Sequence, residues 1–218
     1  MYSNTGNPAV LKLVPADTRL KILDIGCGAG DNASILKSRG YELDGITVSA
    51  EEFRVAERYF NRIFIHNLEL GLPTECTGIY HVIIMSHVLE HIAYPQKLLL
   101  DIQKIILPSS IIIIALPNLL HYRSRIKLLM GNFDYQDSGI WDYTHIRWYT
   151  WRSSKALFEQ LGYNIIHQDV GGELPFGRIM RKIIPFSFNQ ALFRLLKWTS
   201  PGIFGDQILL VARKRIVE

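Results

Sequence analysis

Short aliphatic runs alternate along the chain with stretches in which apolar residues recur every three or four positions. The aliphatic runs predict strands, and near-continuous runs indicate strands buried on both faces of a parallel sheet. They fall at residues 21–25, 42–48, 62–66, 80–85, 110–116, 163–170 and 207–214. The stretches between them predict helices at residues 31–39, 50–60, 95–107 and 151–161.

This alternation predicts a doubly wound α/β fold with three layers around a seven-stranded, mostly parallel sheet. Two long connections interrupt it, at residues 117–150 and 171–206. Both follow the carboxyl ends of strands, which is where open α/β sheets bind ligands. Because long connections in compact domains are usually functional, we expect them to form an acceptor lid within a single domain spanning residues 1–218.

Composition narrows the class of protein. A chain of 218 residues with 48% hydrophobic residues can bury one sizeable core. Its two cysteines, Cys27 and Cys76, provide neither a disulfide framework nor a Cys-x-x-Cys metal motif. No secretory leader is recognised, and the longest aliphatic run, residues 111–116, is too short to span a bilayer. We therefore expect a cytoplasmic enzyme.

The most informative stretch is the glycine-rich turn after the first strand. Asp24 is followed by Gly26, Gly28 and Gly30. Glycines at this spacing allow a tight strand-to-helix turn and a close approach of the backbone to a nucleoside-bearing cofactor. The dinucleotide fingerprint requires a glycine at its sixth position, where this chain has Asp31, so a dinucleotide is disfavoured.

This acid followed by Gly-x-Gly-x-Gly resembles the first motif of class I S-adenosylmethionine (SAM) dependent methyltransferases. The resemblance implies SAM as cofactor and a sheet whose last strand is antiparallel. It also implies cofactor contacts from the ends of the first four strands. The candidate residues are Asp24, Gly26, Cys27, Gly28, Gly30, Thr47, Val48, Ser49, Asn67, Leu68, Ser86 and His87.

Two of these positions depart from the family pattern. Thr47 stands where methyltransferases usually place the acid that binds the ribose hydroxyls. Asn67 aligns with an acid that often holds the adenine amino group, and its side-chain carbonyl can accept the same hydrogen bond. An asparagine that only stabilises a turn is the alternative interpretation of Asn67.

The fourth strand runs into Ser86-His87-Val88-Leu89-Glu90-His91, which is similar to the corresponding stretch of methyltransferases acting on quinol precursors. The resemblance places it between the cofactor and the acceptor. An imidazole there can take a proton from an attacking hydroxyl, so His91 is a candidate general base. Alternatively, Glu90 and His91 pair only to cap the following turn.

The first insertion contains the spacing Asp142-x-x-His145-x-Arg147. On an extended segment, positions 145 and 147 face the same side. His145 is then a second candidate base, oriented by Asp142, and Arg147 suits an anionic group of the acceptor. A buried polar network that fastens the insertion to the sheet is the alternative. Further candidates for binding the acceptor are His121, Arg123 and Trp148. We expect no metal.

The insertion is similar to that of a bacterial subgroup of class I methyltransferases associated with glycosyltransferases of surface-polysaccharide synthesis. This resemblance implies O-methylation of a sugar hydroxyl. The enzymatic alternative is O-methylation of a quinone precursor or another small phenol. A SAM-binding protein without transferase activity is a third interpretation, for which the missing acid at Thr47 is the only argument.

The second insertion combines basic and apolar residues and contains no acid between Glu173 and Asp206. Its basic residues are Arg178, Arg181, Lys182, Arg194 and Lys197. Such a segment suits an anionic membrane surface, the phosphates of a nucleotide-sugar, a lid helix packed on the domain, or a homodimer contact. A nucleic-acid partner is disfavoured, since the chain has no recognised reading motif and no dense basic stripe.

Overall fold

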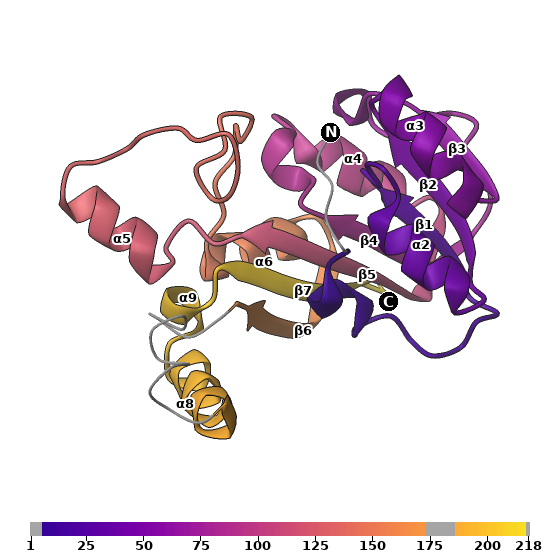
Figure 1. The fold of residues 1–218 in the computed structure, drawn as a ribbon. Coiled ribbons are helices and arrows are strands. Elements are labelled where there is room, and N and C mark those ends of the chain that lie inside the picture. The colour runs from indigo at the N-terminus through magenta and orange to yellow at the C-terminus, as the bar shows by residue number, and fades with distance from the viewer. Residues whose placement is uncertain (1–5, 173–185, 217–218) are drawn as a thin grey trace.

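The structure is a computed structural model that describes residues 6–172 and 186–216. A seven-stranded sheet runs through it in the order β3-β2-β1-β4-β5-β7-β6 (Figure 1). The strands are β1 (Lys21–Ile25), β2 (Glu42–Thr47), β3 (Arg62–Ile65), β4 (Tyr80–Ser86), β5 (Ile106–Pro117), β6 (Tyr163–Gly171) and β7 (Gln207–Lys214). Strands β1 to β5 pair in parallel, and β7 lies antiparallel between β5 and β6. The predicted fold class is confirmed.

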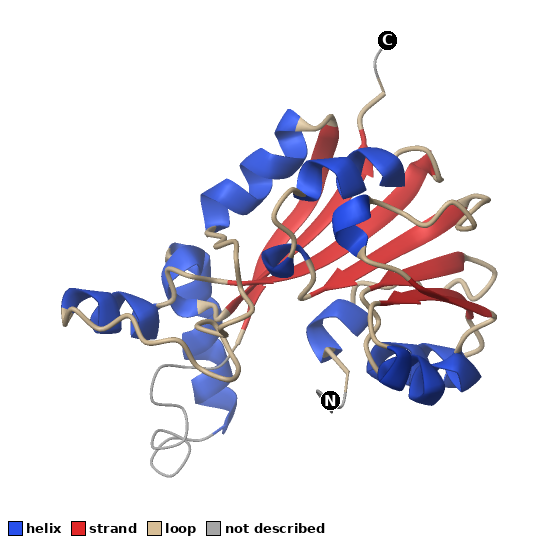
Figure 2. Cartoon of the chain, turned by 90° about the horizontal axis from the view of Figure 1, so that it is seen from above, coloured by secondary structure: helices blue, strands red, loops and turns tan. Residues whose placement is uncertain are grey.

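Helices cover both faces of the sheet, as Figure 2 shows from above. One buried apolar cluster joins the sheet to α1 (Pro8–Leu11), α2 (Asp31–Ser38) and α3 (Ala50–Ala56). A second cluster joins the opposite face to α4 (Pro95–Ile102) and α6 (Trp151–Gln160). Single-turn 3-10 helices η1 (Glu57–Tyr59), η2 (Leu68–Leu70) and η3 (Leu89–His91) follow α3, β3 and β4. The result is the predicted three-layer arrangement.

Local sequence signals set the helix starts. Ser49 accepts the Glu52 amide hydrogen at the start of α3, and Thr150 forms a capping box with Ser153 at the start of α6. The predicted helix over residues 95–107 ends earlier, at Ile102. The reason is that Ile106 already pairs with Tyr80 as the first residue of β5.

Asn118 joins the two insertions. Its amide nitrogen donates to the carbonyls of Gly202 (3.1 Å) and Gly205 (2.8 Å), and its backbone N–H donates to Asp206. The helices of the insertions are α5 (Tyr122–Leu129), α8 (Phe186–Thr199) and α9 (Pro201–Phe204), and α5 and α8 extend away from the sheet (Figure 1). Among the described helices, none is both long and apolar enough to cross a bilayer.

The basic surface expected in the second insertion is only partly visible. Arg178, Arg181 and Lys182 lie outside the described residues. Lys197 on α8 is bound to Asp169 of β6, with a distance of 2.7 Å between Nζ and Oδ2. This cation therefore fastens α8 to the sheet.

A buried ionic cluster lies beside β1, β2 and β3. Asp44 is 1% exposed, and its Oδ2 accepts hydrogen bonds from Arg62 (2.7 Å) and the Tyr80 hydroxyl (2.7 Å) and lies 3.3 Å from Lys21 Nζ. Burial alone would raise the pKa of Asp44, but these three partners together hold it below its ordinary value. The carboxylate therefore contributes stability that is present above its unfolded-state pKa and is lost as pH falls through its lower folded-state value.

We expect Asp44→Asn to lower the free energy of unfolding by about 1–3 kcal/mol at pH 7, a range that allows for solvent screening of Arg62 and Lys21. Urea titrations at pH 7 and pH 3 test this, since the gap to the wild type should narrow at pH 3. Asp17→Asn, in an exposed pair with Arg19, is the control and should leave the midpoint almost unchanged. An equal gap at both pH values would contradict this account.

Candidate active site at the carboxyl edge

The predicted cofactor residues come together at one edge of the sheet. Ile25 is level with Ile46 of β2 and with Met85 of β4 in the parallel register, and Thr47 is level with Ile65 of β3. The glycine turn and the segments after β2, β3 and β4 therefore leave the sheet side by side. The resemblance to class I methyltransferases implies this arrangement, since it expects cofactor contacts from the ends of the first four strands.

The turn after β1 depends on its glycines. Gly26, Gly28 and Gly30 have φ angles of +69°, +55° and +84°, in the region that residues with side chains rarely adopt. A Cβ atom on Gly26 would also lie 2.6 Å from a methyl carbon of Val88. Gly26 is thus fixed by packing as well as by conformation.

The turn fits a ligand that approaches closely. A Cβ on Gly28 would meet a single described atom within 4 Å, Oε1 of Glu52 at 3.9 Å, so the space above this glycine is open. Asp24 is 2% exposed, and no described atom partners its Oδ2. The Cys27 amide donates to Ile46 (2.9 Å), and burial raises the pKa of its thiol, so Cys27 serves as a small neutral wall. An open cradle beside an unpartnered carboxyl suits a polar nucleoside ligand.

The ends of β2 and β3 carry the remaining walls. Val48 is 70% exposed although it is aliphatic, which leaves an apolar surface beside the turn. Ser49 is used as the cap of α3. Asn67 accepts the Glu69 amide (3.0 Å) as the cap of η2, and Leu68 packs partly buried against the core. The turn-stabilising role considered for Asn67 is therefore present in the structure, and its contact with cofactor stays a prediction.

The end of β4 is strained and tightly bonded. His87 has a φ of +58°, the one positive φ among the described residues other than glycine. Its Nδ1 lies 3.2 Å from Oε1 of the fully buried Glu90. Burial alone lowers the pKa of His87, but the bond to Glu90 raises it overall. Ser86 accepts a hydrogen bond from Asn7 (3.3 Å), whose amide also donates to Gln207 (3.0 Å).

The pairing of Glu90 with His91 considered from the sequence is not the contact that the structure shows. Glu90 bonds to His87, whereas His91 turns toward the first insertion and is exposed. His91 Nδ1 lies 3.1 Å from the hydroxyl and 3.3 Å from the carbonyl oxygen of Thr144. Thr144 in turn donates its hydroxyl to Asp142 (2.6 Å). The sequence analysis did not single out Thr144, because nothing local links it to a residue 53 positions earlier.

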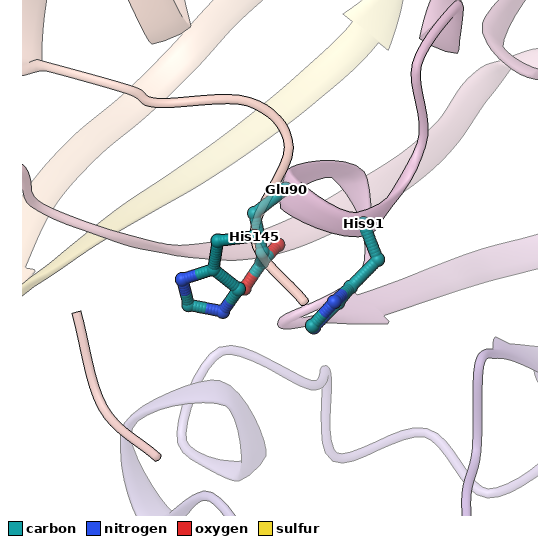
Figure 3. Close-up of side chains that lie close together, drawn as sticks. All are labelled: Glu90, His91 and His145. Atoms are coloured by element: carbon teal, nitrogen blue, oxygen red, sulfur yellow. The ribbon is translucent and has the colours of Figure 1, made fainter. Parts of the chain in front are cut away.

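His145 packs against His91 with its ring centroid 4.8 Å away. It is 7% exposed, and its Nδ1 lies 3.0 Å from the Ile140 carbonyl oxygen, so a main-chain group orients this ring. We expected Asp142 to orient His145, but the partner of His145 Nδ1 is the Ile140 carbonyl oxygen. Figure 3 shows His145, His91 and Glu90 converging from the insertion and from η3.

The backbone of the insertion is bonded to η3. The amides of Ile146 and Arg147 both donate to the Glu90 carbonyl (3.0 Å), and Arg147 Nε donates to Ala93. Trp148 stacks edge-on to His145 at 5.9 Å. This is the fastening role considered for the insertion.

A cavity of about 470 Å³ lies beside this junction. Its lining consists of Ala93, Tyr94, Ile146, Arg147 and Trp148. The lining combines two aromatic rings, two aliphatic side chains and one guanidinium, and it includes neither His91 nor His145.

The two remaining acceptor candidates lie at the start of α5. His121 precedes the helix and is buried, and burial lowers its pKa to about 4. Arg123 is exposed and donates to Tyr122 (2.9 Å). The structure brings Arg147 and Trp148 together at the cavity, whereas His121 and Arg123 belong to the segment that extends away from the sheet (Figure 1).

Within the described ranges, one group of metal-ligand side chains stands out. One ligand atom each of Glu90, His91 and His145 lies within 4.8 Å of the others. Neither nitrogen nor oxygen ligands of this kind decide the metal by themselves. The expectation that the protein works without a metal stays a prediction.

Comparison with known proteins decides the family. Residues 7–168 match the sequence family described as "Methyltransferase domain". The chain belongs to this methyltransferase family. The glycine turn, the open space above Gly28 and the family match together identify SAM as the cofactor of this domain. The resemblance stated from the Asp24 to Gly30 motif is confirmed at this level.

Named relatives and solved structures agree with this assignment. The ubiquinone biosynthesis O-methyltransferase of Rickettsia akari is 31% identical over 104 residues, which cover 46% of this chain and 41% of that protein. The match thus spans less than half of the curated relative. A SAM-dependent methyltransferase structure from Archaeoglobus fulgidus has a TM-score of 0.62 at 20% identity over 89% of this chain and 86% of its own. A second, from Mesorhizobium loti, has a TM-score of 0.62 at 14% identity over 95% and 96%.

The buried carboxyl of Asp24, before the glycine turn, has a predicted effect on stability. Burial raises the pKa of Asp24 to about 7. A carboxyl whose pKa rises on folding destabilises the protein above its unfolded-state value near 3.9, and the cost stops growing above the folded-state value. Asp24→Asn is therefore expected to raise the free energy of unfolding of the ligand-free protein by roughly 1–3 kcal/mol at pH 8 and by almost nothing at pH 4.

Urea titrations at the two pH values measure this difference, and calorimetry with S-adenosylhomocysteine should show weaker binding by the same variant. A stabilising residue change that costs affinity is the usual trade-off at a ligand site. A loss of stability at pH 8, or an equal gain at pH 4, would contradict the buried, unpartnered state of Asp24.

Proposed function

We propose that this protein O-methylates a hydroxyl group of a small acceptor, with His91 as the general base. The observation that carries the proposal is the position of His91. Its ring is exposed in η3, just beyond the end of β4, and it contacts Thr144 of the first insertion. Val88, three residues earlier, packs against Gly26 of the glycine turn.

The hydrogen bonds of His91 favour the required tautomer. The Thr144 carbonyl oxygen can only accept, and the Thr144 hydroxyl already donates its proton to Asp142. Both groups therefore favour a proton on Nδ1 of His91, which leaves Nε2 unprotonated. Such an imidazole takes the proton of the acceptor hydroxyl as its oxygen attacks.

When bound, SAM would supply a methyl group carried on a positively charged sulfur. The leaving group of the transfer is then a neutral thioether. The residues of the chain mainly have to align the acceptor, so positioning contributes much of the rate. Gly26, Gly28 and Asp24 would hold the cofactor beside β1, and the insertion segment fastened to Glu90 would hold the acceptor. The same fastening keeps Thr144 next to His91.

The acceptor best supported is a phenol such as a quinone precursor. The cavity at the junction of the insertion with the segment after η3 offers Tyr94 and Trp148 to a flat ring and Arg147 to an anionic substituent. The curated relative from Rickettsia akari is named for ubiquinone biosynthesis. The sugar hydroxyl expected from the resemblance of the insertion has no counterpart in the names of the relatives reported above, and it stays the second candidate.

Turnover assays with a catechol and with a nucleotide-sugar as acceptor test the chemistry. We expect His91→Ala to lower kcat by roughly 100- to 10,000-fold with the accepted substrate, while SAM affinity stays within a few-fold. His167→Ala, an exposed histidine on β6, is the control and should keep wild-type turnover. Unchanged kcat in His91→Ala would remove this residue as the base.

The Asp142–Thr144–His91 chain predicts a positioning role for Thr144. Thr144→Val keeps the shape but removes the hydroxyl, so we expect kcat to fall about 10-fold with little change in the KM for SAM. Thr144→Ser retains the hydroxyl and should restore most of the rate. If valine and serine variants behave alike in steady-state kinetics, the hydroxyl does not position His91.

A further inference from the structure

A carboxylate from α3 lies at the end of β2, where the sequence pattern does not predict one. Thr47 occupies the position of the expected ribose-binding acid, and it is 2% exposed. Its hydroxyl donates to Oε2 of Glu52 over 3.0 Å. The side chain of Glu52, from the first turn of α3, thus returns to the end of the strand.

Glu52 does not form the capping box that its position in the sequence predicts. The spacing Ser49-x-x-Glu52 is that of a capping box, in which the glutamate would accept the backbone N–H of Ser49. In the structure that N–H donates to the Thr47 hydroxyl oxygen instead (3.3 Å). Ser49 still caps the Glu52 amide (3.2 Å), so the helix start is satisfied without the Glu52 carboxylate.

The second oxygen of this carboxylate faces the glycine turn. Oε1 of Glu52 lies 3.9 Å from the position that a Cβ of Gly28 would take, and it is the nearest described atom there. Glu52 is half-buried, and no described residue donates a hydrogen bond to Oε1. An acceptor oxygen is therefore aimed into the open space above Gly28.

We propose that Glu52 is the ribose-binding carboxylate of this methyltransferase domain, with Thr47 as the residue that orients it. A ribose has two neighbouring hydroxyls that can donate to one carboxylate, and an acid roughly 20 residues beyond a glycine turn does this in dinucleotide-binding folds. This inference rests on the SAM cofactor of the proposed function. It replaces the acid that is missing at Thr47 with one supplied by α3.

Calorimetry with S-adenosylhomocysteine tests the inference on the whole chain. Glu52→Gln is expected to weaken binding by about 10- to 100-fold, the range for a lost hydrogen bond to a charged group. Glu51→Gln, the exposed neighbour in the same helical turn, removes the same charge and should stay within twofold. Equal affinities of the two variants would overturn the proposal.

An analogue of S-adenosylhomocysteine without the 2′ and 3′ hydroxyls separates recognition from folding. The wild type should bind it more weakly than the parent compound, and Glu52→Gln should cause almost no further loss. The double variant Thr47→Asp, Glu52→Gln places an acid at the strand end and should regain part of the affinity for the parent. A loss of the same size for both ligands would show that Glu52 acts only on the fold. Failure of the wild type to bind S-adenosylhomocysteine would instead remove the cofactor assignment itself.

Discussion

The site depends on a backbone turn with positive φ angles at three glycines. Gly26 and Gly30 combine positive φ angles with neighbours at the distance where a Cβ would lie, Val88 in one case and Tyr59 in the other. The contact between Gly26 and Val88 brings the segment after β4 against the turn after β1. The strained end of β4 and the glycine turn are therefore positioned by the same contact. Gly28, between them, has the same backbone conformation but open space above it.

Two kinds of interaction hold the side chains at the carboxyl edge of the sheet. Polar atoms close to the strands are held by local bonds, as Ser49 and Asn67 are at helix starts. Groups beyond the end of β4 are held by the first insertion, whose backbone is bonded to Glu90. The insertion is thus bonded to η3 and also provides Thr144, the neighbour of His91, which we propose as the base.

The fold could be predicted because each strand is one apolar run and the turn after β1 has a glycine pattern. The insertions also begin and end where the strand pattern stops. The details of the site depend on contacts between distant residues. The pairing of His91 with Thr144 and of Lys197 with Asp169 leaves no periodic signal. The orientation of Glu52 even contradicts its local pattern, because Ser49-x-x-Glu52 would predict a capping box.

The central claim is that the edge formed by the glycine turn and the end of β2 binds SAM. The most direct test is calorimetric titration of the unaltered protein with SAM and with S-adenosylhomocysteine. The account predicts binding of both at one site per chain, and competition between them. A folded protein that binds neither compound would contradict it.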